Sequence, residues 1–181
     1  LNPTMQQIYT KRYLTPFGEY IPLRDIATKF SSYANDVTDF AGGTDDHVFS
    51  VNGLSFQTLI CYELLNDSFR DQISGDFLIV QTNNATFGDT PQLDQQLNIA
   101  KVRALETGRF IPYVSTTGVT SFIDNRGRID SQLPKFDSAT LIDTITSTQG
   151  KTLTQVIGKY LEGISIIWLL IILTLRRRIP A

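Results

Sequence analysis

The amino-acid sequence predicts an α/β fold in which helices pack on a mixed β-sheet. Apolar segments of strand length alternate with segments of helical periodicity, which is typical of layered α/β domains. The run F-L-I-V-Q at 77–81 is apolar almost throughout, as in strands that are buried on both faces. Asn52-Gly53 separates two further strand-like runs and is the strongest short signal of a type I′ hairpin, which adds antiparallel pairing.

The remaining elements follow from turn, cap and periodicity signals. We expect strands over residues 9–14, 48–51, 54–60, 77–81, 110–116, 119–124, 128–133 and 139–145. We expect helices over residues 24–33, 64–73 and 91–108, and a polar, glycine-rich loop over 34–47. Pro91 opens the longest helix and Gly108 closes it. The apolar face of that helix is expected to consist of Leu93, Leu97, Ala100, Ala104 and Leu105.

The composition limits the function. A chain of 181 residues, 41% hydrophobic and 19% charged, is typical of one folded domain and not of a disordered chain. The formal net charge of −2 gives no basic field, so we expect no nucleic-acid partner. One cysteine excludes an intrachain disulfide, and one histidine is too few for a histidine-rich site, so we expect no metal and no cofactor.

The C-terminal segment differs in character from the rest. Residues 163–175 are almost purely apolar, and the triplet Arg176-Arg177-Arg178 follows at once. A membrane span needs about 20 apolar residues, which this run reaches only when it is extended back across two charged residues. The triplet favours a transmembrane helix with its arginines on the cytoplasmic side, and a helix buried in a soluble domain is the alternative. We therefore divide the chain into a catalytic domain, 1–150, and a linker, membrane helix and basic tail, 151–181.

The only cysteine lies where a nucleophile would be held rigidly. Cys61 ends the expected strand 54–60 and precedes a helical stretch. Taken alone, a single cysteine is better explained as a small buried apolar side chain. A cysteine attacks as its thiolate, and an ordinary thiol pKa of about 8.5 leaves few thiols ionised at neutral pH, so a base or a cation must be near. Lys11 and Glu19 are the available partners, although such residues are in general solvated surface groups; a lysine ammonium also stabilises an oxyanion.

Five ordered segments resemble the carbon–nitrogen hydrolase (nitrilase) superfamily and, within it, the apolipoprotein N-acyltransferases. They are Y-T-K-R-Y-L-T-P-F-G-E-Y-I-P at 9–22, L-I-C-Y-E at 59–63, T-N-N-A-T-F-G at 82–88, A-K-V-R-A-L-E-T-G-R at 100–109 and T-T-G-V-T-S-F-I-D-N-R-G at 116–127. The resemblance covers nearly the whole chain, and the trailing apolar helix fits the same branch. It implies a nitrilase-like α-β-β-α sandwich, of which this chain holds the C-terminal part, followed by one transmembrane helix.

The resemblance also implies roles for individual residues. Cys61 matches the nucleophile, Lys11 matches the lysine of a Glu–Lys–Cys triad, and Glu19 matches a further active-site glutamate. The expected substrate-binding residues, beside the nucleophile and in the loop after strand 77–81, are Tyr62, Glu63 and Asn83.

The sequence departs from the family pattern in three places. The triad glutamate, which acts as the general base, has no match in the ten residues before Lys11. Because the chain also begins with Leu1 rather than methionine, we expect it to be part of a longer protein and to be inactive alone. Asn84 and Thr86 stand where the family usually has Asp and Trp. A tryptophan there would pack on acyl chains, so lipid handling is in question; neutral drift with compensation nearby is the alternative.

The implied reaction is a two-step acyl transfer. Cys61 takes an acyl chain from a phospholipid, phosphatidylethanolamine, as a thioester, and the α-amino group of a diacylglyceryl-cysteine on an apolipoprotein then receives it. The implied place is the bacterial cytoplasmic (inner) membrane, with the catalytic domain on the periplasmic face. Two rival interpretations stay open: an amidase of the same superfamily, and an inactive fragment that only binds lipid or a partner.

Overall fold

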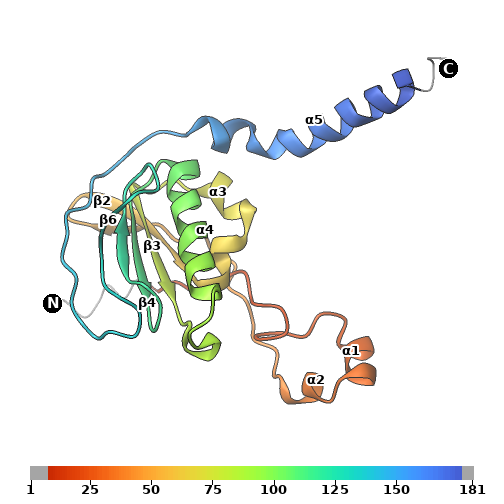
Figure 1. The fold of residues 1–181 in the computed structure, drawn as a ribbon, viewed down its shortest axis with the longest axis horizontal. Coiled ribbons are helices and arrows are strands. Elements are labelled where there is room, and N and C mark those ends of the chain that lie inside the picture. The colour runs from red at the N-terminus through yellow and green to blue at the C-terminus, as the bar shows by residue number, and fades with distance from the viewer. Residues whose placement is uncertain (1–7, 177–181) are drawn as a thin grey trace.

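The computed structural model describes residues 8–176, which form a six-stranded sheet, helices against it and a long C-terminal helix that leaves the body (Figure 1). The strands are β1 (Phe49–Val51), β2 (Leu54–Ile60), β3 (Phe77–Thr82), β4 (Ile111–Ser115), β5 (Ser121–Ile123) and β6 (Ile129–Gln132). The α-helices are α1 (Arg24–Phe30), α2 (Tyr33–Asp36), α3 (Asp67–Gln72), α4 (Gln92–Thr107) and α5 (Leu153–Arg176). Two 3₁₀ turns are η1 (Cys61–Leu65) and η2 (Ala85–Phe87).

The sheet is mixed, as the sequence predicts, and its strands lie in chain order from β1 to β6. The central strands β2, β3 and β4 are parallel, and antiparallel strands extend the sheet on both sides. Parallel strands have their carboxyl ends at one edge of the sheet, so the residues after β2, β3 and β4 come together there.

Backbone angles confirm two local predictions. Asn52 and Gly53 both have positive φ, 48° and 81°, and connect β1 to β2 in the expected hairpin. Gly108 ends α4 in the left-handed conformation, with φ 63°. Leu105 departs from the predicted buried face, since it is 59% exposed while the other four predicted positions are buried. It lies about a third of a turn beyond Ala104, which places it outside the apolar stripe.

The core lies between the sheet and the helices α3 and α4, which cover one face (Figure 1). Its buried side chains come from β2 to β5, η1 and the two helices: Leu59, Leu64, Phe69, Ile73, Leu78, Val80, Leu97, Ala100, Ala104, Ile111, Tyr113 and Ile123. On the opposite face the rings of Phe49, Phe56 and Phe77 stack in a row, with centroids 5.1 Å and 5.2 Å apart. The described residues thus supply one helical layer and one sheet layer of the expected sandwich.

Three predictions of secondary structure are wrong or incomplete. Residues 9–14 form no strand, because backbone N–H groups of this segment bond to the Glu63 carboxylate instead of to a neighbouring strand. Residues 139–145 run as an irregular strap that buries little, with Ile142 88% exposed. The expected helix over 64–73 is divided at Asn66, whose side chain caps α3 by accepting from the Ser68 backbone N–H at 2.9 Å.

Residues 17–40 form an arm that projects from the body (Figure 1). The helix predicted over 24–33 is present as α1, and α2 forms one short turn mostly within the predicted loop 34–47. Large apolar or aromatic side chains are exposed along the arm: Phe17, Leu23, Ile26, Phe30, Tyr33 and Phe40. Arg24 holds the arm together by donating to the carbonyls of Ala34 and Val37 at 2.6 Å and 2.7 Å.

The segment expected to be a polar linker is fastened to the body. Arg109 is 3% exposed and donates from Nη2 to the carbonyl of Gly150 at 2.7 Å. Gln155, in the first turn of α5, is buried and donates to the carbonyls of Arg70 and Ile73 at 2.9 Å and 3.4 Å. The base of α5 therefore has a fixed place against α3.

The helix α5 is 24 residues long, and its segment Leu153–Leu175 is long and apolar enough to cross a membrane. The side chains of its apolar run are exposed in this structure. Arg177 and Arg178 of the arginine triplet lie outside the described residues, so the orientation inferred from the triplet stays a prediction.

Candidate active site

Cys61 lies immediately after β2, at the first residue of η1. Its φ of 53° is in the left-handed region, which costs a residue with a Cβ about 1–3 kcal/mol. Pairing of β2 with β3 continues to Ile60, so the backbone is held up to the residue before the thiol. Cys61 is half-buried and lines a cavity of about 170 Å³. A rigid strand and a sharp turn thus present the thiol to a cavity.

The cavity at Cys61 has a mostly apolar wall. Its lining residues are Thr15, Cys61, Tyr62, Leu65, Phe87, Gln92, Gln95, Gln96 and Ile99. None of them is a carboxylate or a histidine, so this wall offers the thiol no general base. Within residues 8–176, no group of three or more His, Cys, Asp or Glu side chains lies close enough to hold a metal ion.

Lys11 and Glu19 form a short ion pair beside this cavity. Lys11 Nζ lies 2.6 Å from Glu19 Oε2 and 3.2 Å from Thr15 Oγ1, and the Thr15 backbone N–H donates to Glu19 Oε2 at 2.6 Å. Burial raises the pKa of Glu19, but hydrogen bonds from Lys11 and Thr15 outweigh it and hold that pKa below its ordinary value. Glu19 is therefore ionised at neutral pH. Because Thr15 also lines the cavity, it connects the pair to the wall that holds Cys61.

Glu63 lies behind the cavity wall rather than in it. It is fully buried, and its Oε1 accepts from the Tyr9 hydroxyl and from the backbone N–H groups of residues 12 and 13, at 2.8, 2.6 and 3.2 Å. Its Oε2 accepts from the Ile60 backbone N–H at 2.8 Å. Both oxygens are engaged by the chain itself, which differs from the substrate contact expected from the sequence. The carboxylate joins the nucleophile turn to the segment that carries Lys11.

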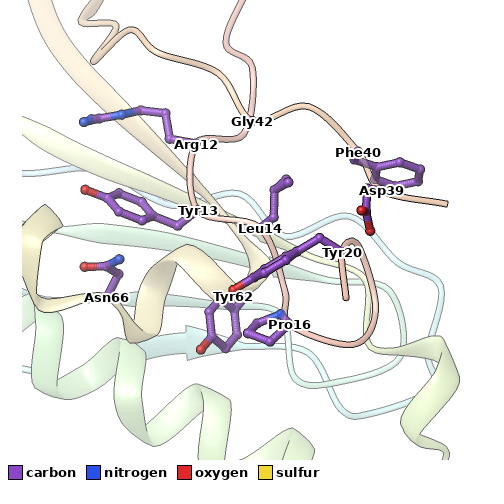
Figure 2. A pocket seen from close by; sticks show the side chains of 10 residues that line it. All are labelled: Arg12, Tyr13, Leu14, Pro16, Tyr20, Asp39, Phe40, Gly42, Tyr62 and Asn66. Carbon is purple, nitrogen blue, oxygen red and sulfur yellow. The ribbon is translucent and has the colours of Figure 1, made fainter. Parts of the chain in front are cut away.

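Tyr62 lines both the cavity at Cys61 and a second, larger one of about 620 Å³ (Figure 2). The lining of the larger cavity mixes polar and apolar groups: Arg12, Tyr13, Leu14, Pro16, Tyr20, Asp39, Phe40, Gly42, Tyr62 and Asn66. Figure 2 shows the ring of Tyr62 beside Pro16 and Tyr20. Tyr62 therefore stands at the boundary between the two spaces.

Asn83 and Asn84 follow β3 but have different surroundings. Asn83 is exposed, and its Oδ1 accepts from the backbone N–H of Ala85 at 3.2 Å and from Thr116 Oγ1 at 3.1 Å. It lines neither of the two cavities. Asn84 is fully buried, and its Nδ2 donates to Ser115 Oγ at 3.1 Å. The departure from the family pattern at residue 84 thus lies inside the protein, in a polar network without charge.

The sequence interpretation missed two residues of this site. Thr15 links the Lys11–Glu19 pair to the cavity, and Gln96 on α4 has its Nε2 3.9 Å from Cys61 Sγ. The available signal for Gln96 was its place beside Leu97, at the edge of the buried face of α4.

The family follows from the sequence match. The model for carbon–nitrogen hydrolase matches residues 1–153 of the 181. The chain belongs to the carbon–nitrogen hydrolase family. A solved carbon–nitrogen hydrolase superfamily protein from Xanthomonas campestris, with an arsenic adduct in its active site, aligns with a TM-score of 0.52 at 14% identity, over 85% of this chain and 55% of that one. At that identity the likeness shows the fold alone.

Relatives of this carbon–nitrogen hydrolase family member are named apolipoprotein N-acyltransferase. The protein of Vibrio cholerae is 36% identical over 153 residues, which is 82% of this chain and 30% of that protein. The protein of Haemophilus influenzae is 33% identical over 175 residues, which is 93% of this chain and 34% of that protein. The chain therefore spans about a third of the length of the relatives that it matches.

Proposed function

We propose that the protein containing this chain has the activity of the apolipoprotein N-acyltransferases. It transfers an acyl chain from a phospholipid to the α-amino group of the N-terminal diacylglyceryl-cysteine of an apolipoprotein. The observation that carries the proposal is a cysteine at a sharp turn that faces an apolar cavity. An acyl chain gains about 25 cal/mol for each Å² of apolar surface that it buries there, whereas a short amide has little such surface.

In the first half-reaction the Cys61 thiolate attacks the ester carbonyl of the donor, phosphatidylethanolamine. The C–S bond forms and the carbonyl oxygen becomes an oxyanion; the ester C–O bond then breaks and the lysophospholipid leaves with the proton that the base took from the thiol. We assign Lys11, with backbone N–H groups near Cys61, to stabilising the oxyanion. Glu19 holds the Lys11 ammonium in place through the 2.6 Å ion pair.

In the second half-reaction the α-amino group of the acceptor attacks the thioester. The C–N bond forms, the C–S bond breaks, and the amine proton passes to the base while the Cys61 thiolate is restored. We assign the base to the triad glutamate of the family, which no residue before Lys11 matches. Glu19 is held in its ion pair, and both oxygens of Glu63 are engaged, so neither is placed to act as the base.

We assign the acyl part of the donor to the cavity at Cys61 and a polar part of a substrate to the larger cavity across Tyr62. The smaller cavity, about 170 Å³, holds only a portion of an acyl chain. The larger one carries Arg12 and Asp39, which suit a polar headgroup or a peptide. Tyr62 then contacts substrate from the boundary. The expected contact of Asn83 with substrate stays a prediction, because Asn83 lines neither cavity.

The proposed place of the reaction is the bacterial cytoplasmic membrane, with the domain on its periplasmic face and the C-terminal arginines in the cytoplasm. The length and apolarity of α5 support a membrane location, and both proposed substrates carry lipid.

The test must separate acyl transfer from amide hydrolysis and from mere binding. The full-length protein, in detergent micelles, is given a phospholipid with a labelled acyl chain, a diacylglyceryl lipopeptide and, separately, a short amide. The proposal predicts label on the amino group of the lipopeptide. An amidase would release ammonia from the short amide and leave the lipopeptide unlabelled. A protein that only binds lipid would do neither.

A further inference from the structure

A hydrogen-bonded chain of neutral side chains leads from the interior to the Cys61 sulfur. Gln96 Nε2 lies 3.9 Å from Cys61 Sγ, within hydrogen-bond distance for sulfur. The Oε1 of Gln96 accepts from Thr82 Oγ1 at 3.1 Å. Thr82 is 6% exposed and Gln96 is half-buried, so the carboxamide bridges the interior and the cavity.

The inner end of this chain is anchored by Asn84. Asn84 is fully buried, and its Oδ1 accepts from Thr82 Oγ1 at 2.7 Å. Its Nδ2 donates to Ser115 Oγ, and its backbone N–H donates to Thr116 Oγ1 at 3.0 Å. These partners come from β3, β4 and the residue after β4, so the network is held by the end of the sheet. None of these partners carries a charge, which explains why a neutral asparagine suits position 84, since a buried carboxylate would lack a cation here.

The structure places the Gln96 carboxamide with its Nε2 toward the Cys61 sulfur and its Oε1 toward Thr82 Oγ1. The Thr82 hydroxyl has one proton, which lies between two carbonyl oxygens, Oδ1 of Asn84 at 2.7 Å and Oε1 of Gln96 at 3.1 Å. The N–H groups of Gln96 are therefore the part of the carboxamide that faces the sulfur. An N–H that donates to a thiolate favours the charged form, and a carboxamide has no charge of its own to lose with pH.

We infer that Gln96 is a further residue of the nucleophile site, whose N–H stabilises the Cys61 thiolate, and that Thr82 and Asn84 position it. The inference rests on the proposed function only in taking Cys61 as the nucleophile. Gln96 touches the reacting sulfur, whereas Thr82 and Asn84 act through it.

The experiment measures the reactivity of Cys61 in the full-length protein as a function of pH. Iodoacetamide labels the thiol, and mass spectrometry follows the peptide that contains Cys61. In Gln96→Leu the pH midpoint of the labelling rate should rise by about one unit, so that labelling at pH 7 slows about tenfold. Asn98→Leu is the matched control, since Asn98 is exposed on α4 and lines neither the cavity at Cys61 nor the larger one across Tyr62, and it should stay within about twofold of the parent.

A second variant keeps the test independent of packing at position 96. Thr82→Val removes the hydroxyl that orients the carboxamide, and its midpoint should move in the same direction by a smaller amount. An unchanged or lowered midpoint in Gln96→Leu would overturn the inference, and a lowered one would mean that the carbonyl oxygen faces the thiol. If Gln96→Leu shifts the midpoint but the parent gains no acyl group from phospholipid, the inference stands and the proposed function fails.

Discussion

At the carboxyl ends of β2 and β3 the chain places Cys61 and Asn84, whereas at the amino ends of β3 and β4 it places Asp76 and Arg109. At the first end the thiol is half-buried in a strained turn and faces a cavity. At the second end both charged groups are buried and their hydrogen bonds go to the chain itself. The difference is one of access: the thiol at the first end can be reached from a cavity, whereas the partners of Asp76 and Arg109 at the second end are groups of the protein. We therefore expect changes at the first end to affect chemistry and changes at the second end to affect stability.

The amino ends of β3 and β4 hold the linker in place through Asp76 and Arg109, which we call the linker clamp. Arg109 donates to the carbonyls of Gly75 and Gly150 at 2.6 Å and 2.7 Å. Asp76 accepts from the backbone N–H and the hydroxyl of Ser55, both at 2.8 Å, and from Gln149 at 3.2 Å. Burial lowers the pKa of Arg109, but an arginine stays charged in a protein at neutral pH. These bonds fix the segment that leads into α5.

The largest expected effect is a loss of activity without a loss of stability, and it comes from a change at Cys61, at the carboxyl end of β2. Cys61→Ala should abolish transfer of the acyl chain to a lipopeptide, because no other thiol in this chain can form the thioester. The unfolding midpoint should change little, since the thiol is only half-buried and the change removes a single heavy atom. Lipopeptide acylation and urea unfolding of the full-length variant measure the two effects. Retained transfer in this variant would show that Cys61 is not the nucleophile.

A comparable loss is expected for the 181-residue chain on its own. No residue lining the cavity at Cys61 is a carboxylate or a histidine, so the thiol proton has no acceptor there. The chain is expressed in a membrane mimic and assayed for phospholipid-dependent acylation beside the full-length protein. Turnover similar to that of the full-length protein would mean that Glu19 or Glu63 serves as the base.

The next largest effect is expected from the loss of Lys11, the cation that we assign to the oxyanion. Lys11→Met should lower the rate of transfer by about 10² or more, as the loss of one oxyanion donor does. Lys11→Arg should rescue little, since a planar guanidinium does not reproduce a compact ammonium. Lys29→Met, at an exposed position on α1, is the control and should leave the rate unchanged. Equal rates in both methionine variants would remove Lys11 from the site.

A change at the amino ends of β3 and β4 should lower the stability of the protein and leave its rate of acyl transfer per folded molecule unchanged. Arg109→Met leaves the carbonyls of Gly75 and Gly150 without this donor and should lower the free energy of unfolding by about 2–4 kcal/mol. Arg126→Met, which replaces an exposed side chain, should cost less than about 0.5 kcal/mol. Urea unfolding compares the two variants. A rate per folded molecule that falls in Arg109→Met without a loss of stability would contradict the division between the two ends.

The smallest effect is a pH dependence. Hydrogen bonds from the Ser55 backbone N–H and hydroxyl hold the pKa of Asp76 below its ordinary value. A lowered pKa in the folded state stabilises the protein above the ordinary aspartate pKa of about 3.9, and this stabilisation is lost as the pH falls through the lowered value. The unfolding midpoint of Asp76→Asn should therefore fall less than that of the parent between pH 7 and pH 2.5. Unfolding midpoints measured across this pH range test the prediction. A parent and a variant with parallel acid profiles would show that Asp76 does not contribute.

The elements predicted correctly are those with local signals. The Asn52-Gly53 hairpin, the apolar strand β3 and the capped helix α4 are each fixed by residues adjacent in sequence. Residues 9–14 do not form the strand that the sequence predicts, because the partner of their backbone N–H groups, Glu63, lies about 50 residues away along the chain. The burial of Glu63 could not be predicted for the same reason, since the groups that bind its carboxylate are far from it in the sequence.

The place of Cys61 at the end of a strand could be predicted from the sequence, and the family resemblance proposes it as the nucleophile, but its polar surroundings could not be predicted. Gln96 reaches the sulfur of Cys61 from a residue 35 positions later. Such a contact depends on how α4 packs against the ends of β2 and β3, which no local pattern specifies.

The central claim, that Cys61 carries the acyl chain, is tested most directly by mass spectrometry. The full-length protein is incubated with phosphatidylethanolamine in the absence of an acceptor, digested at low pH to preserve thioesters, and examined at the peptide that contains Cys61. The account predicts that this peptide gains the mass of one acyl chain, that hydroxylamine removes it, and that Cys61→Ala never acquires it. A parent protein that acylates lipopeptide but shows no acyl mass at Cys61 under these conditions would contradict the account.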